Sequence, residues 1–371
     1  MKKFLILTAA AVAVFASCAK TIDHTRNTGP GTPVGFGVYA GNAPTKVTAI
    51  TTENLSSFGV YASYSDGAEW ATTGTMNFMF DQEVTGSHAG GFTYSPVKYW
   101  PNETTDRLSF WAYAPFKSAT NGITENTTNT TAGYPKITYT LPATDANQVD
   151  LLWATPQMNK VNNSAYTSGT ANPSAGDATI SNKVVLTFHH ALALLDVQAR
   201  YLVDLVNSGS TTGAAVPAAT TVTINSISLS GSFPASGDLN LNDGTWSNQG
   251  AAAATAFTRS FSPAKAVTNE NASIIAANEQ MMVIPPASGD NTITITVNYN
   301  VTTTDDKLSG GKSVVTNELT SSGEITIVGG KKYKLILVLG LTSVKLDVVV
   351  EDWPTDFDDE AEVNLPLNQN S

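Results

Sequence analysis

Two adjacent histidines, His189 and His190, are the residues whose type first suggests metal binding. The surrounding segment, residues 183–200, opens with alternating apolar and polar side chains, which predicts a strand. Neighbouring side chains on a strand point to opposite faces, so the pair cannot easily chelate one ion. No cysteine and no close cluster of carboxylates supports a metal site. We therefore expect a structural role at a strand corner and predict no metal.

An acidic run near the C-terminus raises the question of calcium binding or glycoside hydrolysis: Asp356, Asp358, Asp359, Glu360 and Glu362. The run lacks the glycine-punctuated spacing of an EF-hand loop. Glycosidase carboxylates must face each other across a sugar, which the linear order does not show. The chain also has no GxSxG elbow, HExxH motif or Walker pattern. We interpret the run as a solvated turn and predict neither an enzyme nor a cofactor.

The only cysteine, Cys18, follows a short leader. Two lysines precede an apolar stretch at 4–16, which has the length of a signal peptide and is too short to span a bilayer. Small residues before a lone cysteine resemble a bacterial lipobox, in which the cysteine becomes the acylated N-terminus. This pattern predicts a lipoprotein signal peptide over 1–18 and an exported, lipid-anchored protein. An ordinary secretory leader with an incidental cysteine is the alternative.

The composition limits the classes of partner and fold. The net charge is −11 and only 14% of the 371 residues are charged. Nucleic-acid binding needs clustered Lys and Arg, so we expect no nucleic-acid partner. Abundant Thr and Val favour strands, while Asn, Gly, Ser and Asp favour the turns between them. The length suggests two domains at roughly 100–200 residues per domain.

The first expected strand follows a flexible tether at 19–33 that is rich in Gly and Pro. It covers 34–40 and places Val34, Phe36, Val38 and Ala40 on one face. The pentapeptide FGVYA at 36–40 recurs at 58–62. The recurrence suggests two strands in equivalent edge positions of one sheet, with chance similarity as the alternative.

The densest aromatic segment covers 93–116 and contains an expected strand between Pro101 and Pro115. Proline cannot donate to a strand ladder and so marks the ends of pairing. A buried sandwich core is the interpretation we favour for these rings. An exposed aromatic platform for sugars or peptides is the alternative.

The second half has regular strand patterns punctuated by Gly-Asp, Asp-Gly and Gly-Gly turns. Strands at short, even spacing indicate β-sandwiches and not a βαβ fold. A polar loop ends near 182, so we predict an all-β protein with one sandwich over 34–182 and another over 183–371.

Several motifs together resemble the Bacteroidales fimbrillin family of surface lipoproteins. They occur in the family's order along nearly the whole chain. They are Cys18, FGVYA at 58–62, VKYWP at 97–101, LSFWAYAP at 108–115, DLLWA at 150–154, the pattern VxLxFHH ending at His190, and VEDW at 350–353.

The resemblance implies two transthyretin-like β-sandwich domains in tandem and a role as a fimbrial subunit or adhesin. In that family a trypsin-like protease removes the first strand, and a C-terminal strand of the next subunit fills the exposed groove. Such β-strand addition draws affinity from main-chain hydrogen bonds and specificity from alternate side chains. Here the removable strand corresponds to Val34, Phe36, Val38 and Ala40, with cleavage after Lys46. Arg26 is a second candidate, but cleavage there leaves the strand in place.

The resemblance also implies a donor strand near Val363, Leu365 and Leu367. The expected partners are other fimbrial subunits, in a homopolymer or a heteropolymer, together with a host or bacterial surface ligand. Because the tail is short, a tip or accessory subunit that accepts a strand without donating one stays open beside a stalk subunit. The alternative function is a non-polymerising surface lipoprotein that binds glycan or peptide.

Overall fold

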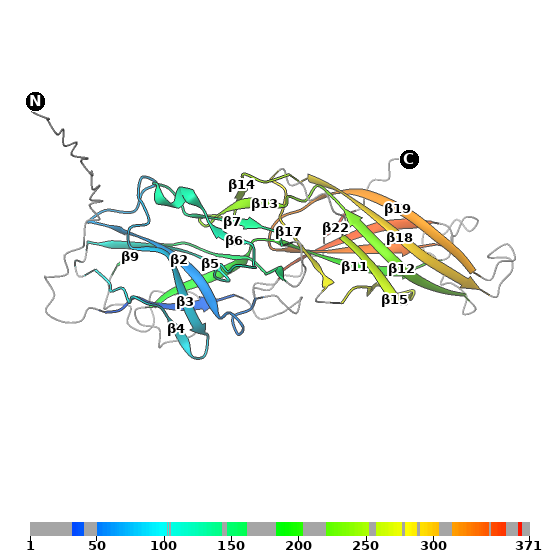
Figure 1. The fold of residues 1–371 in the computed structure, drawn as a ribbon, viewed down its shortest axis with the longest axis horizontal. Coiled ribbons are helices and arrows are strands. Elements are labelled where there is room, and N and C mark those ends of the chain that lie inside the picture. The colour runs from blue at the N-terminus through cyan, green and yellow to red at the C-terminus, as the bar shows by residue number, and fades with distance from the viewer. Residues whose placement is uncertain are drawn as a thin grey trace, which may run out of the picture.

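A computed structural model describes residues 32–40, 50–101, 103, 105–142, 147–161, 183–202, 220–251, 257–276, 279–287, 290–303, 314–340, 343–353 and 363–365. Most of the elements in this part of the chain are strands (Figure 1). One short 3-10 helix in it, η2 (Thr127–Thr130), follows β6 (Ile123–Glu125) and precedes β7 (Lys136–Thr140). Within these residues no helix has the length and apolar character needed to cross a membrane. The prediction of an all-β protein is confirmed.

The largest sheet has eight strands, and each of its faces is buried over its central part. Its order is β1 (Gly35–Tyr39), β10 (Lys183–His190), β8 (Leu152–Ala154), β5 (Arg107–Ala114), β2 (Ser57–Ser65), β3 (Met79–Ser87) and β4 (Gly91–Thr93), while β9 (Gln157–Lys160) also pairs with β5. The two end strands of this order, β1 and β4, contact each other. The sheet therefore curls around the side chains on its inner face.

Alternation along β5 separates two cores. Leu108 and Phe110 point to the inner face and belong to core A, which also holds Phe36, Phe58 and Phe188. Trp111 and Tyr113 point to the opposite face and belong to core B. Both sets are fully buried, because this strand lies in the interior of the sheet.

Core B is closed by a four-stranded sheet that chain segments from both halves build. Its order is β14 (Trp246–Ser247), β13 (Ser236–Asn240), β7 (Lys136–Thr140) and β6 (Ile123–Glu125). Figure 1 shows the β13–β14 hairpin beside β6 and β7. Leu239 of β13 and Ile137 of β7 are direct cross-strand partners, and both are buried in core B.

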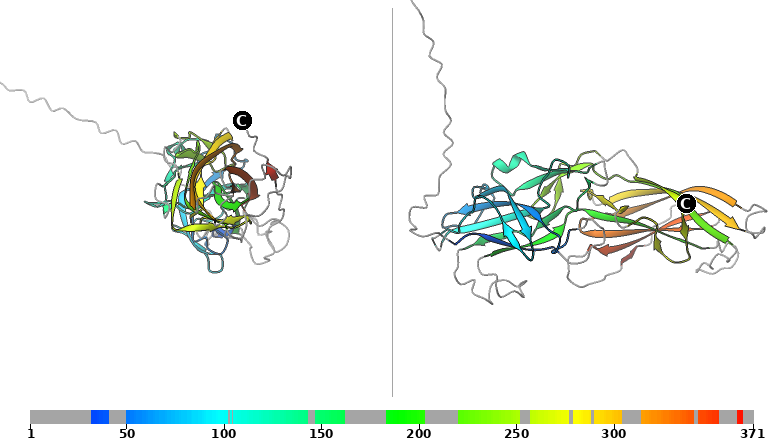
Figure 2. Two further views of the ribbon diagram at one scale, coloured as in Figure 1. Left: turned by 90° about the vertical axis from the view of Figure 1, so that its right-hand side faces the viewer. Right: turned by 60° about the horizontal axis from the view of Figure 1, so that its bottom comes forward.

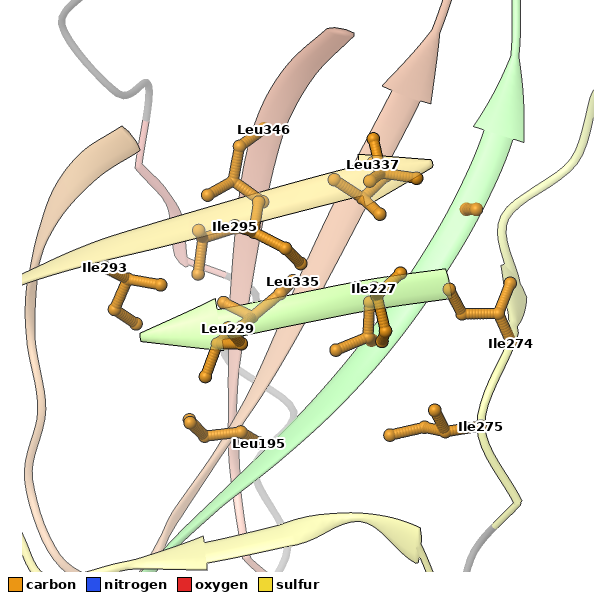
Figure 3. Packing of buried hydrophobic residues seen from close by; sticks show 14 of the residues in the cluster. Leu195, Ile227, Leu229, Ile274, Ile275, Ile293, Ile295, Leu335, Leu337 and Leu346 are labelled. Carbon is orange, nitrogen blue, oxygen red and sulfur yellow. The ribbon is translucent and has the colours of Figure 1, made fainter. Parts of the chain in front are cut away.

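A second sandwich encloses core C, whose side chains come from two facing sheets (Figure 2). One sheet has the order β16 (Ala272–Ser273), β11 (Ala193–Tyr201), β20 (Lys331–Leu339), β21 (Val344–Asp352) and β22 (Val363–Leu365), with β17 (Met281–Val283) also on β11. The other has the order β15 (Phe257–Val267), β12 (Thr220–Ser230), β18 (Asp290–Thr303) and β19 (Val314–Thr326). In Figure 3, Leu229 and Ile295 of one sheet point toward Leu335 of the other.

Strand pairing crosses the predicted boundary at residue 183 in two places. β10 pairs with β1 and β8 in the eight-stranded sheet, and β13 pairs with β7. The division into two domains stays a prediction, and these pairings show that the polar loop ending near 182 does not separate the sheets.

Candidate functional site

The candidate site is the segment 34–40, which consists of β1 and one flanking residue on each side and for which the sequence predicts exchange. Successive side chains of a strand point to opposite faces, so every second side chain of this segment points toward core A. Val34, Phe36, Val38 and Ala40 are 2%, 2%, 5% and 2% exposed, respectively, and all four belong to core A. The predicted inward face of this strand is therefore the observed one.

The chain is hydrogen-bonded on both edges at the start of β1, although β1 stands at the end of the sheet order. On one edge it pairs in parallel with β10, in a register that sets Gly35 opposite Lys183 and Tyr39 opposite Thr187. On the other edge the Val34 N–H donates to the Lys98 carbonyl at 2.9 Å. The Trp100 N–H donates to the Thr32 carbonyl, also at 2.9 Å. The start of β1 thus lies between β10 and the segment at 98–100 and is hydrogen-bonded to that segment.

The side chain of Tyr94 makes further hydrogen bonds at the start of β1. Its hydroxyl donates to the Val34 carbonyl at 2.8 Å and accepts from the Lys98 N–H at 3.3 Å. Burial raises the pKa of Tyr94 to about 12, because a charged phenolate would lose its hydration there. The hydroxyl therefore remains a donor at neutral pH.

Phe36 is the largest side chain that β1 buries in core A. Its ring makes edge contacts with three others: Phe58 at 5.9 Å, Tyr94 at 5.7 Å and Phe110 at 6.0 Å between centroids. Edge-to-face pairs are each worth about 0.5–1.5 kcal/mol beyond the area that they bury. The pocket around Phe36 is therefore shaped for an aromatic ring.

A buried polar unit is formed by Asp150, His190 and Trp353, next to Ile50. Asp150 is fully buried, and its carboxylate accepts from His190 Nδ1 and from the Ile50 N–H, each at 2.8 Å. The His190 ring stacks on Trp353 at 4.2 Å with an interplanar angle of 8°. Sequence reasoning did not predict this contact. The motifs could have suggested it, since Asp150, His190 and Trp353 belong to three of the motifs on which the family resemblance rests.

The two histidines do point to opposite faces, as the strand pattern predicts. His189 faces the other way from His190 and packs on Trp153, with the ring centroids 5.0 Å apart and the planes tilted by 37°. Its Nε2 lies 2.7 Å from the Thr155 hydroxyl. Burial, and secondarily the neighbouring His190, lower the pKa of His189. The described part of the chain contains no group of three or more His, Cys, Asp or Glu placed to hold a metal ion.

The remaining predicted site residues lie at the chain ends. Cys18, Arg26, Lys46 and Leu367 are outside the described residues. Val363 and Leu365 belong to β22, which pairs antiparallel with β21 and sets Val350 opposite Val363 and Val348 opposite Leu365. The predicted donor strand thus extends a sheet of the second sandwich.

The aromatic rings do not form an open platform in the described residues. Trp100 is 5% exposed and Trp70 packs edge-on against Trp111 at 4.9 Å. Trp246 is half-buried, and its indole N–H donates to the Ala191 carbonyl at 3.1 Å. These rings fill cores A and B, as the favoured interpretation of the aromatic segment expects.

A family profile described as fimbrillin-like matches residues 45–353 of this chain. The chain belongs to the fimbrillin-like family. No curated protein sequence matches it. The matched range contains the Asp150, His190 and Trp353 unit as well as the second FGVYA copy at 58–62.

Solved structures resemble this chain at low sequence identity. A fimbrial protein from Bacteroides vulgatus ATCC 8482 superposes with a TM-score of 0.62 at 17% identity, over 87% of this chain and 99% of that one. A candidate cell adhesion protein from Bacteroides uniformis ATCC 8492 gives a TM-score of 0.41 at 17% identity, over 87% and 98%. The first of these similarities shows that this fimbrillin-like chain adopts the fold of that fimbrial protein.

Proposed function

We propose that this chain is a subunit of a surface fimbria or a fimbrial adhesin, assembled by protease-triggered β-strand exchange. It would be exported as a lipoprotein, acylated at Cys18 and carried to the outer surface of the outer membrane. Its partners would be other fimbrial subunits, and a surface ligand where it acts as an adhesin. Family membership and the fimbrial relative support a structural, non-enzymatic role.

The single observation that carries the exchange hypothesis is the placement of β1. This strand supplies four buried side chains to core A, yet it is the end strand of its sheet and the first strand of the described chain. Burying a Val or Phe side chain contributes about 1.5–3 kcal/mol, so Val34, Phe36 and Val38 together contribute roughly 4.5–9 kcal/mol. Removing β1 would uncover Phe58 and Phe110 and leave a groove that another strand can fill.

Cleavage after Lys46 would cut the covalent link between β1 and the rest of the sheet. The strand would then be held only by the contacts described above and could be displaced. Before cleavage, β1 would keep an aggregation-prone sheet edge covered during export.

Trypsin treatment of the purified precursor tests this proposal. We expect a cut after Lys46, loss of the 34–46 segment by mass spectrometry, and higher oligomers by size-exclusion chromatography. A Lys46→Gln variant should keep the strand and stay monomeric, whereas Arg26→Gln should assemble like the parent. A precursor that stays monomeric with 34–46 still attached would contradict the proposal.

A further inference from the structure

The side chains of β1 define what a replacement strand must present, on the assumption that the proposed exchange takes place. Four inward positions are available, filled now by Val34, Phe36, Val38 and Ala40. The second position is the most demanding, because the Phe36 ring touches Phe58, Tyr94 and Phe110 at their edges. An aliphatic residue there would lose these three contacts and leave unfilled volume in core A.

The two outward glycines of β1 place little restriction on the side chain of a replacement strand. A Cβ at Gly37 would meet Val185 Cγ2 at 3.6 Å, which is an ordinary contact. A Cβ at Gly35 would meet only the flexible Lys183 side chain, at 3.2 Å. At these two positions selectivity between strands therefore comes from the backbone, and the inward face supplies the side-chain requirement.

The backbone of β1 presents alternate residues to alternate edges. The Val34 N–H points to Lys98, away from β10, so Gly35, Gly37 and Tyr39 turn their N–H groups to β10. A replacement strand that runs in the same direction needs an N–H at each of these outward positions. Proline at one of them would remove a ladder hydrogen bond.

The chain's own tail meets neither requirement. The sequence Val363-Asn-Leu-Pro-Leu367 has no aromatic residue. With Val363, Leu365 and Leu367 inward, Pro366 takes an outward position and faces β10 in every parallel register. An antiparallel insertion would turn Pro366 to the other edge, but the aromatic ring is missing in either direction.

We propose that the groove beneath β1 selects a strand from a different kind of subunit. That strand carries an aromatic side chain at its second inward position, aliphatic or small side chains at the other three, and no proline between them. This chain would then accept a foreign strand at β1 and would not form a homopolymer through its own 363–367 segment.

Peptide binding to the cleaved protein tests this selectivity. Trypsin-cleaved protein is unfolded in urea, separated from the released strand, and refolded with a fluorescent peptide, and Kd is measured by anisotropy. Peptide 33–41 of this chain is the reference. Its Phe36→Leu version should bind about tenfold more weakly, and its Gly37→Ala version, changed only on the outward face, should bind within about twofold of the reference.

The tail peptide, residues 362–369, should bind at least tenfold more weakly than the reference. A version with Leu365→Phe and Pro366→Gly should recover most of that loss. Tail binding equal to the reference, or a Phe36→Leu peptide equal to the reference, would overturn the selectivity while leaving strand exchange intact. Failure of the reference peptide itself to bind would instead contradict strand exchange at β1.

Discussion

Removing the Asp150 carboxylate should be among the most damaging single changes outside the aromatic cores. Asp150 is fully buried and accepts from His190 Nδ1 and from the Ile50 N–H. An Asp150→Ala variant leaves both donors without an acceptor, at about 1–3 kcal/mol each. Truncating one partner of a buried pair costs about 3–5 kcal/mol in other proteins, which agrees with that sum. We expect the free energy of unfolding to fall by about 3–5 kcal/mol.

Urea unfolding at pH 7, followed by tryptophan fluorescence, measures this change. Asp347→Ala is the matched control, since Asp347 is partly exposed and pairs with Arg200 and Lys345. Exposed ion pairs contribute about 0–1 kcal/mol, so the control should lose no more than that. A loss below about 1 kcal/mol in Asp150→Ala would refute the reasoning, because a buried and a half-buried donor cannot both lose their acceptor at so small a cost.

The double variant Asp150→Ala with His190→Ala separates the shared contact from the rest. Once the carboxylate is gone, His190 has lost its hydrogen bond to Asp150 and keeps its stacking on Trp353. The second substitution should therefore cost less in the Asp150→Ala background than in the parent, by about 1–3 kcal/mol. Strictly additive losses would show that the two residues act independently.

Three further predictions concern core A and its rim. Phe110→Ala should lower the free energy of unfolding by about 3–5 kcal/mol through cavity formation, whereas Phe80→Ala, at a side chain 40% exposed, should cost less than about 1 kcal/mol; urea titration compares them. The pKa of Tyr94 is raised to about 12, so the protonated hydroxyl stabilises the folded protein fully below pH 10 and this stabilisation is lost as the pH rises from 10 toward 12. In a Tyr94→Phe variant, the free energy of unfolding measured by urea titration should therefore fall less steeply between pH 10 and 12. Gly86→Ala should lower the Tm, because φ at Gly86 is 152° and a Cβ there would lie 2.1 Å from a carbonyl oxygen of β4; an unchanged Tm would contradict this strain argument.

The inward faces of the strands were predictable from the sequence because side-chain alternation fixes them. Phe36 and Val38 had to share a face, and so did Leu108 and Phe110, whatever lay beside them. The neighbours of each strand were not predictable in this way. The period of two is the same for every partner, so it does not reveal that β1 pairs with β10, almost 150 residues later.

The two FGVYA copies illustrate the same limit. Phe36 and Phe58 both enter core A, as their shared alternation predicts, and their strands lie in one sheet. Yet β1 is at an end of the strand order, whereas β2 pairs on both sides, with β3 and β5. What distinguishes the two positions is the presence of neighbouring strands, which five residues of local sequence do not encode.

The parallel pairing of β1 with β10 bears on how a fimbria made of such subunits would carry load. A strand that replaces β1 beside β10 would transmit a pull along its own axis as shear across a row of backbone hydrogen bonds, which must break together. β10 ends at His190, and only Ala191 and Leu192 separate it from β11, the strand that pairs with β20 in the second sandwich. The buried contacts of His190 with Asp150 and Trp353 therefore lie at the short connection through which a pull on β10 would pass along the chain into β11.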